Sequence, residues 1–97
     1  MSAAAQTSYN GTLARDIDVS YGVGGQNSVT GSMLNKSDRS VDVTVSFKGY
    51  ASDGSVIQGD PSATIAHLSP GESARFRAAG FSEMATTAKL IEVRTVP

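Results

Sequence analysis

His67 is the only histidine of the chain, and it lies between Ala66 and Leu68 just before a turn-forming segment. A zinc site would need further ligands beside this imidazole, and Ser-His-Asp catalysis would need the same imidazole as its base. Cysteine is absent and no Gly-x-Ser-x-Gly motif is present, which excludes thiolate ligands, thiol nucleophiles and a nucleophile elbow. We therefore expect His67 to be a surface residue at a strand end, and the protein not to be an enzyme.

Two pairs of aspartates have the chemistry for calcium binding or for acid-base work. Asp16 and Asp18 are two residues apart, which places both on one face of a strand, and Asp53 and Asp60 flank a hairpin signal. Alternation puts the first pair on the solvent face, and an aspartate before a glycine is typical of a turn. Neither pair follows the EF-hand series of calcium ligands, so we expect no metal site and no cofactor.

The glycines of residues 22–25 are followed by a strand pattern, whereas a phosphate-binding loop leads into a helix. Arg75, Arg77 and Arg94 would form a small positive face if their strands are neighbours; otherwise they blunt a solvated edge. Eight basic and nine acidic residues alternate along the chain and give a net charge of −1. No basic stripe results, so nucleic acid is not an expected partner.

The length of 97 residues allows one domain around one core. Hydrophobic residues make up 39% of the chain and the mean hydropathy is −0.13, too apolar for disorder and too polar for a membrane span. We expect residues 1–11 to be a flexible N-terminal tail and residues 12–97 to be the domain. The tail lacks the basic start and apolar run of an export signal, although its small residues would suit a tether left after such a signal was replaced by an initiator methionine.

Alternation of apolar and polar residues predicts about seven strands. The clearest is residues 41–48, where three valines and Phe47 point to one side, and we expect Phe76 of a later strand to join them in the core. The predicted strands are residues 12–21, 28–35, 41–48, 56 onward, 63–68, 74–78 and 90–96. This pattern predicts an all-β fold, an antiparallel immunoglobulin-like β-sandwich, with a small barrel as the alternative.

Two turns and one strand edge stand out. Asp53-Gly54 is a hairpin signal, and Pro70-Gly71 suits a type II turn, because glycine accepts the positive φ that both turns require. Val56 and Ile57 are adjacent apolar residues, so both cannot face the core of a regular strand. We expect one of them to be exposed at an interaction edge, with a β-bulge or burial beneath the loop of residues 22–27 as the alternative.

Residues 29–96 resemble the FxLYD domain, a small bacterial immunoglobulin-like module of exported proteins and lipoproteins. The matching parts are Gly31-x-Met33-x-Asn35, a valine-rich strand ending in Phe47, the Asp53-Gly54 hairpin, and Leu68-Ser69-Pro70-Gly71-Glu72 before a strand with Phe76. The naming motif is half kept, because Phe47 and Tyr50 are present while Gly49 and Ala51 replace its leucine and aspartate. The resemblance implies an immunoglobulin-like fold, a cell-envelope or extracellular location, and no catalytic residues.

Together these features predict a non-enzymatic envelope or extracellular module, acting as a spacer or as a protein-interaction domain through loops or an edge strand. We expect any contact to use such surfaces and no concave pocket, because inward-pointing side chains fill a thin sandwich. The alternative is a structural or decoration component of a phage or another large assembly. An export signal in the full gene would favour the first, and high-order assembly the second.

Overall fold

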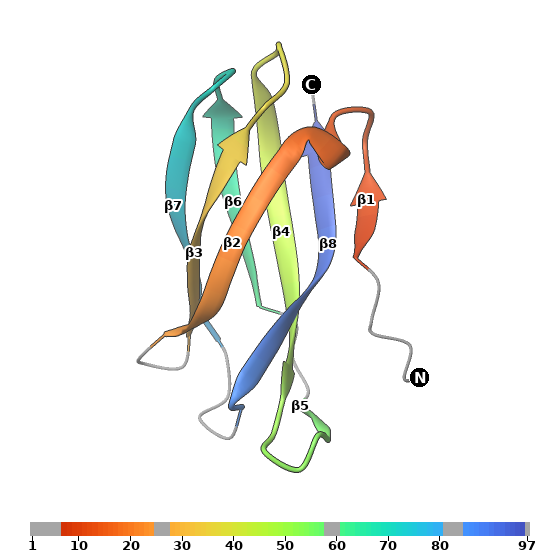
Figure 1. Cartoon of the computed structure of the whole chain (residues 1–97), viewed down its shortest axis with the longest axis vertical. Helices are drawn as coiled ribbons and strands as arrows, with labels where there is room; N and C mark the ends of the chain where they lie inside the picture. The colour runs from red at the N-terminus through yellow and green to blue at the C-terminus, as the bar shows by residue number, and fades with distance from the viewer. Residues whose placement is uncertain (1–6, 25–27, 58–60, 81–84, 97) are drawn as a thin grey trace.

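The computed structural model describes residues 7–24, 28–57, 61–80 and 85–96, and it confirms an all-β fold. The strands are β1 (Ser8–Asn10), β2 (Ile17–Gly24), β3 (Ser28–Asn35), β4 (Val41–Tyr50), β5 (Val56–Ile57), β6 (Ser62–Leu68), β7 (Ser73–Ala78) and β8 (Thr87–Val96), with one 3₁₀ turn, η1 (Ala14–Asp16). Seven of the eight strands correspond to predicted ones (Figure 1). No described helix is long and apolar enough to cross a membrane.

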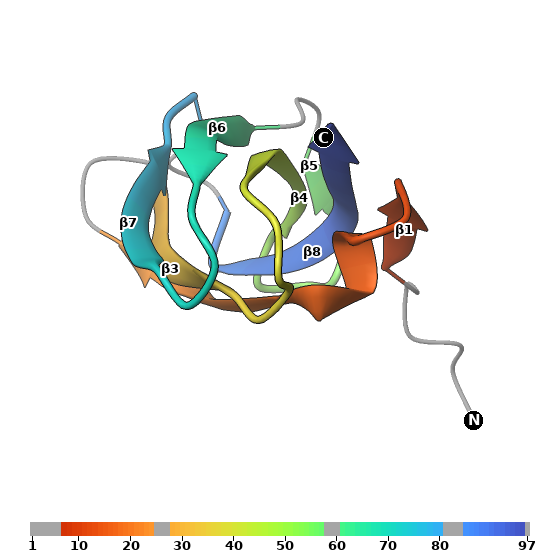
Figure 2. The same ribbon diagram turned by 90° about the horizontal axis from the view of Figure 1, so that it is seen from above.

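Two sheets face each other. One has the order β1-β8-β4-β5, with β6 also paired to β4, and the other has the order β2-β3-β7. Every pairing is antiparallel except that of β1 with β8, which is parallel. Seen from above, the sheets curve around a shared interior, with β6 and β7 side by side at one flank (Figure 2). The fold is therefore sandwich-like, as predicted.

The core follows from alternation along β4, where every second residue from Val41 to Gly49 is buried. The Phe47 ring is fully buried and meets two rings of the opposite sheet: its centroid lies 4.9 Å from that of Tyr21 and 5.7 Å from that of Phe76. Phe76 is only 6% exposed, which confirms its predicted core position. An aromatic contact thus joins the two sheets at the centre of the fold.

The predicted tail ends too late in the sequence. Ser8–Asn10 form β1, whose register pairs Ser8 with Glu92 of β8, and the Arg15 guanidinium lies 4.6 Å from the centre of the Tyr9 ring. All three residues of β1 are exposed, so pairing with β8 and not burial of a side chain holds this short strand in place. Alternation could not have revealed it.

The first predicted strand also begins too early. Ala14 is fully buried and Ile17 is 4% exposed, and this spacing of three residues belongs to a helical turn and not to a strand. Asp16 donates its amide to the Leu13 carbonyl at 3.0 Å inside η1. The strand therefore starts at Ile17 and continues through Gly24, into the segment predicted as a turn. Residues 25–27 of that predicted turn lie outside the described part of the chain.

Both predicted glycine turns are present. Gly54 has a φ of 88°, and the side chain of Asp53 accepts hydrogen bonds from the Ser55 amide at 2.9 Å and the Ser55 hydroxyl at 2.6 Å. Gly71 follows Pro70 with a φ of 76°, between β6 and β7. The Gly54 turn joins β4 to β5 within one sheet, and the Gly71 turn carries the chain from β6 to β7 of the opposite sheet.

Candidate functional site

His67 lies at a strand end, as predicted, and its side chain is 90% exposed. Its φ is 56°, the only positive value of a non-glycine residue among those described. The β4–β6 register shifts here, and the His67 amide donates to Oδ1 of Asp42 at 2.9 Å, while the same oxygen lies 3.9 Å from Nδ1. Asp42 thus holds a β-bulge, a structural role for both residues.

The described aspartates of the two predicted pairs form no site with one another. Asp16 is in η1 and Asp18 is in β2, so their expected place on one strand face is wrong, and Oδ1 of Asp18 lies 3.1 Å from Nζ of Lys36. Hydrogen bonds from Ser55 lower the pKa of Asp53 below its ordinary value. Asp60 lies outside the described residues. Within the described ranges, no three histidine, aspartate or glutamate side chains are close enough to hold a metal ion.

The three arginines do not share one face. Arg75 and Arg77 are on β7 in the three-stranded sheet, whereas Arg94 is on β8 in the other sheet. Nη2 of Arg94 lies 3.2 Å from Oε2 of Glu92, and the same oxygen accepts a hydrogen bond from the side-chain amide of Asn10 at 2.5 Å. These contacts tie β1 to β8, so Arg94 is part of strand pairing and not of a positive face with β7.

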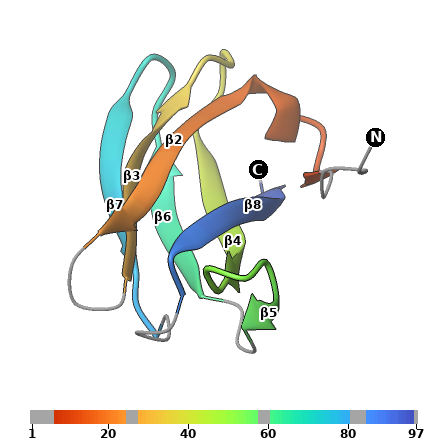
Figure 3. The same cartoon turned by 60° about the horizontal axis from the view of Figure 1, so that its bottom comes forward.

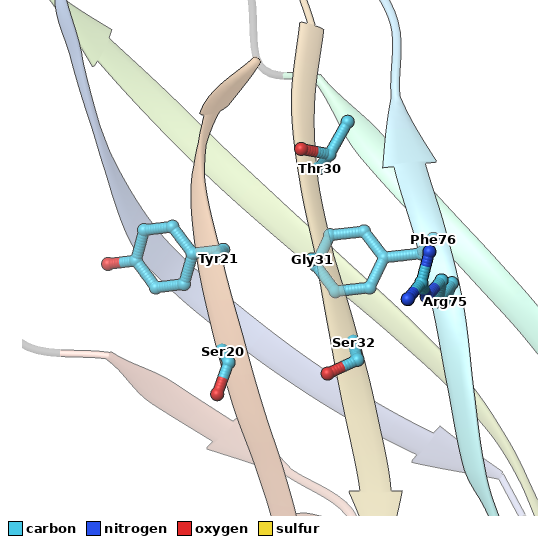
Figure 4. Close-up of a pocket in the computed structure, with 7 residues that line it drawn as sticks. All are labelled: Ser20, Tyr21, Thr30, Gly31, Ser32, Arg75 and Phe76. Carbon is cyan, nitrogen blue, oxygen red and sulfur yellow. The ribbon is translucent and has the colours of Figure 1, made fainter.

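One shallow hollow lies along β2, β3 and β7, contrary to the expectation that no concave pocket exists. It has a volume of about 570 Å³, and four of its lining residues carry a hydroxyl group, beside the guanidinium of Arg75 (Figure 4). The lining residues are Ser20, Tyr21, Thr30, Gly31, Ser32, Arg75 and Phe76. The prediction considered only the space between the two sheets, which side chains fill. This hollow instead opens to solvent along the β2-β3-β7 sheet.

Gly31 lines this hollow and lies at a close approach between the backbones of β3 and β2. It pairs with Tyr21 on one side and with Phe76 on the other. A Cβ at this position would overlap the carbonyl oxygen of Ser20 and lie 2.8 Å from Cα of Tyr21, so only glycine fits. A glycine in the middle of an alternating strand was the signal for a close backbone approach.

The two apolar residues of β5 differ in exposure, as predicted. Val56 is 52% exposed, whereas Ile57 is half-buried and packs against the core. β5 is the last strand in its sheet order and lies beside the end of β4 (Figure 3). A strand at the edge of a sheet has unpaired backbone groups to which another chain can pair, and Val56 places an apolar side chain beside them.

The neighbours of Val56 extend this edge into a broader surface. Tyr50 of β4 pairs with Val56 of β5 on one side and with Thr87 of β8 on the other. Two residues earlier on the same face of β4, Lys48 lies directly opposite Lys89 of β8. Nζ of Lys89 lies 5.7 Å from the centre of the Tyr50 ring. We call Lys48, Tyr50, Val56, Thr87 and Lys89 the lysine face.

The lysine face was missed because it depends on pairing between strands far apart in the sequence. The β4–β8 register shifts between Ser46 and Phe47, so the extra residue is Ile91. An unshifted register would not bring Lys48 opposite Lys89. No single-strand pattern reports such a bulge.

No family model, no curated protein and no solved structure matches the chain.

Proposed function

We propose that this chain is a non-enzymatic immunoglobulin-like module of the bacterial envelope or extracellular space, and that it contacts another protein through the β5 edge. The observation that carries this proposal is Val56, which is 52% exposed on a two-residue terminal strand. A hydrophobic side chain beside unpaired strand edges favours association with another chain. The resemblance of residues 29–96 to the FxLYD domain supports the envelope location.

The roles of the polar residues support a function without catalysis. Asp42 holds a bulge, Asp53 holds a turn, and Glu92 joins β8 to Asn10. Side chains used in this way fix backbone geometry, whereas a general base needs to face a cavity that holds substrate. An interaction module needs only a rigid scaffold and an exposed surface.

The experiment is photo-crosslinking from position 56 in the cell that makes the protein. A benzophenone amino acid replaces Val56 in one variant and Val96 in the control, because Val96 is a valine of matched exposure (53%) at the far end of the same sheet. We expect a discrete protein adduct from position 56 and none from position 96, in an envelope or secreted fraction. Absence of any adduct from position 56 would leave only a passive spacer. An adduct within assembled particles would favour the alternative, a component of a phage or another assembly.

A further inference from the structure

We infer that the lysine face binds an acidic polypeptide segment that also presents aliphatic side chains. This inference rests on the proposed function, since it names the chemistry of the partner that the β5 edge would contact. The face combines two cationic side chains with the half-buried ring of Tyr50 and the exposed Val56. Carboxylates and aliphatic groups are the complements of these two components.

The strongest feature is the direct cross-strand pairing of Lys48 with Lys89. Like charges at directly opposite positions of an antiparallel pair repel each other and destabilise the sheet. Neither ammonium forms an ion pair with a residue in the described part of the chain. A bound carboxylate between the two would convert this repulsion into attraction.

Charge is compensated differently elsewhere on the sheets. Lys36 lies 3.1 Å from Asp18, and Arg94 lies 3.2 Å from Glu92. Both pairs neutralise a cation with a carboxylate of a neighbouring position. The Lys48–Lys89 row differs from these surfaces because it has two cations and no described carboxylate lies within ion-pair distance of either. Glu92, in the adjacent row, is already bonded to Arg94 and Asn10.

The apolar half of the face is held in place by the backbone. The Tyr50 carbonyl accepts the Thr86 amide at 2.8 Å, and the Ala51 amide donates to the Ser55 carbonyl at 2.9 Å. These bonds fix the ends of β4, β5 and β8 against one another. A partner that docks here does not need to order this part of the chain, which lowers the entropic cost of binding.

The arrangement favours an extended polypeptide over a polyanion. The Tyr50–Val56 row and the Lys48–Lys89 row are two residues apart along β4, about 6.5–7 Å. Successive side chains on one face of an extended partner have the same spacing, so a carboxylate and an aliphatic group meet the two rows together. The chain as a whole has a net charge of −1, and the described part of this face offers two cations, which is unfavourable for a nucleic acid or an anionic membrane.

The test uses a fluorescent, acetylated peptide in which a glutamate and a valine alternate with threonines, so that both lie on one face when the peptide is extended. We expect measurable binding by anisotropy, and about tenfold weaker binding to the Lys48→Gln, Lys89→Gln double variant. The matched control is the Arg39→Gln, Arg75→Gln double variant, which loses the same charge at exposed positions away from the lysine face. It should bind the peptide as the parent protein does.

Three outcomes would overturn the inference. One is binding that does not depend on charge, seen either as equal binding of a peptide with lysine in place of glutamate or as unchanged binding by the Lys48→Gln, Lys89→Gln variant. The second is tighter binding of single-stranded DNA or phosphatidylglycerol vesicles than of the acidic peptide. The third is a clearly lowered melting temperature of the double variant, which would show that the lysines pair within the chain. If the position-56 adduct persists while peptide binding fails, the proposed function stands and only the acidic partner is wrong.

Discussion

The Tyr21 hydroxyl accepts a hydrogen bond of 2.9 Å from the backbone amide of Leu90, and this bond joins the edge strand β2 to β8 of the opposite sheet. Leu90 immediately precedes Ile91, the extra residue of the β4–β8 bulge, and its carbonyl accepts a hydrogen bond from the Thr7 hydroxyl at 2.8 Å. Both backbone groups of Leu90 are therefore bonded outside β4. The bulge would otherwise expose them, so Tyr21 couples the two sheets at the point where the ladder is irregular.

Replacing Tyr21 with phenylalanine removes this acceptor and leaves the contact with Phe47 in place. We expect the free energy of unfolding to fall by about 0.5–1.5 kcal/mol, measured by urea denaturation. Hydrogen exchange at the Leu90 amide should become faster. The control is Tyr9→Phe, whose ring lies on the exposed strand β1. Equal losses in both variants would show that the Tyr21 bond adds nothing.

Phe76→Ala should lower the free energy of unfolding by about 3–5 kcal/mol, because a large ring leaves a gap beside Phe47. Phe76→Leu keeps most of the volume and should cost clearly less. Chemical denaturation measures both variants. A loss below about 1 kcal/mol for the alanine variant would contradict the buried position of this ring.

The strands whose one face is buried were predictable from the sequence, because burial imposes alternation on β3, β4 and β7. Elements held by backbone or cross-strand contacts were not. β1 buries no side chain, and η1 interrupts the alternation where Ala14 enters the core. The exposure of Val56 was predicted from its apolar neighbour Ile57, whereas Lys48 and Lys89 come together only through a shifted register.

Gly31→Ala should destabilise the protein, because the new Cβ would meet the Ser20 backbone, which cannot move without displacing β2. We expect a loss of about 1–3 kcal/mol by thermal or urea denaturation. Gly22→Ala in the adjacent strand is the matched control, since nothing lies within 4 Å of its Cβ position. The control should stay within about 0.5 kcal/mol of the parent. Similar effects at both positions would argue against the close approach at Gly31.

Asp53 should make stability depend on pH in the acidic range. The Ser55 side-chain hydrogen bond first, and then its backbone hydrogen bond, lower the pKa of this carboxyl in the folded protein. The stabilisation is therefore present above the unfolded-state pKa, near pH 4, and is lost as the pH falls through the folded-state pKa. In Ser55→Ala the pKa of Asp53 should rise toward its ordinary value, as measured by carboxyl NMR titration. An unchanged titration would show that the Ser55 hydroxyl does not hold the turn.

The same substitution should cost little stability at Val56 and clearly more at Ile57. Val56→Ser should change the free energy of unfolding by about 0.5 kcal/mol or less, because the side chain is 52% exposed. Ile57→Ser should cost about 1–3 kcal/mol, because Ile57 packs against the core. Urea denaturation measures the free energy of unfolding of both variants.

The charge placed at position 56 should decide how strongly the acidic peptide binds. Val56→Glu should weaken binding more than Val56→Lys, because both remove the apolar group but only glutamate repels the acidic partner. Equal binding by the two charged variants would show that Val56 contacts no acidic partner.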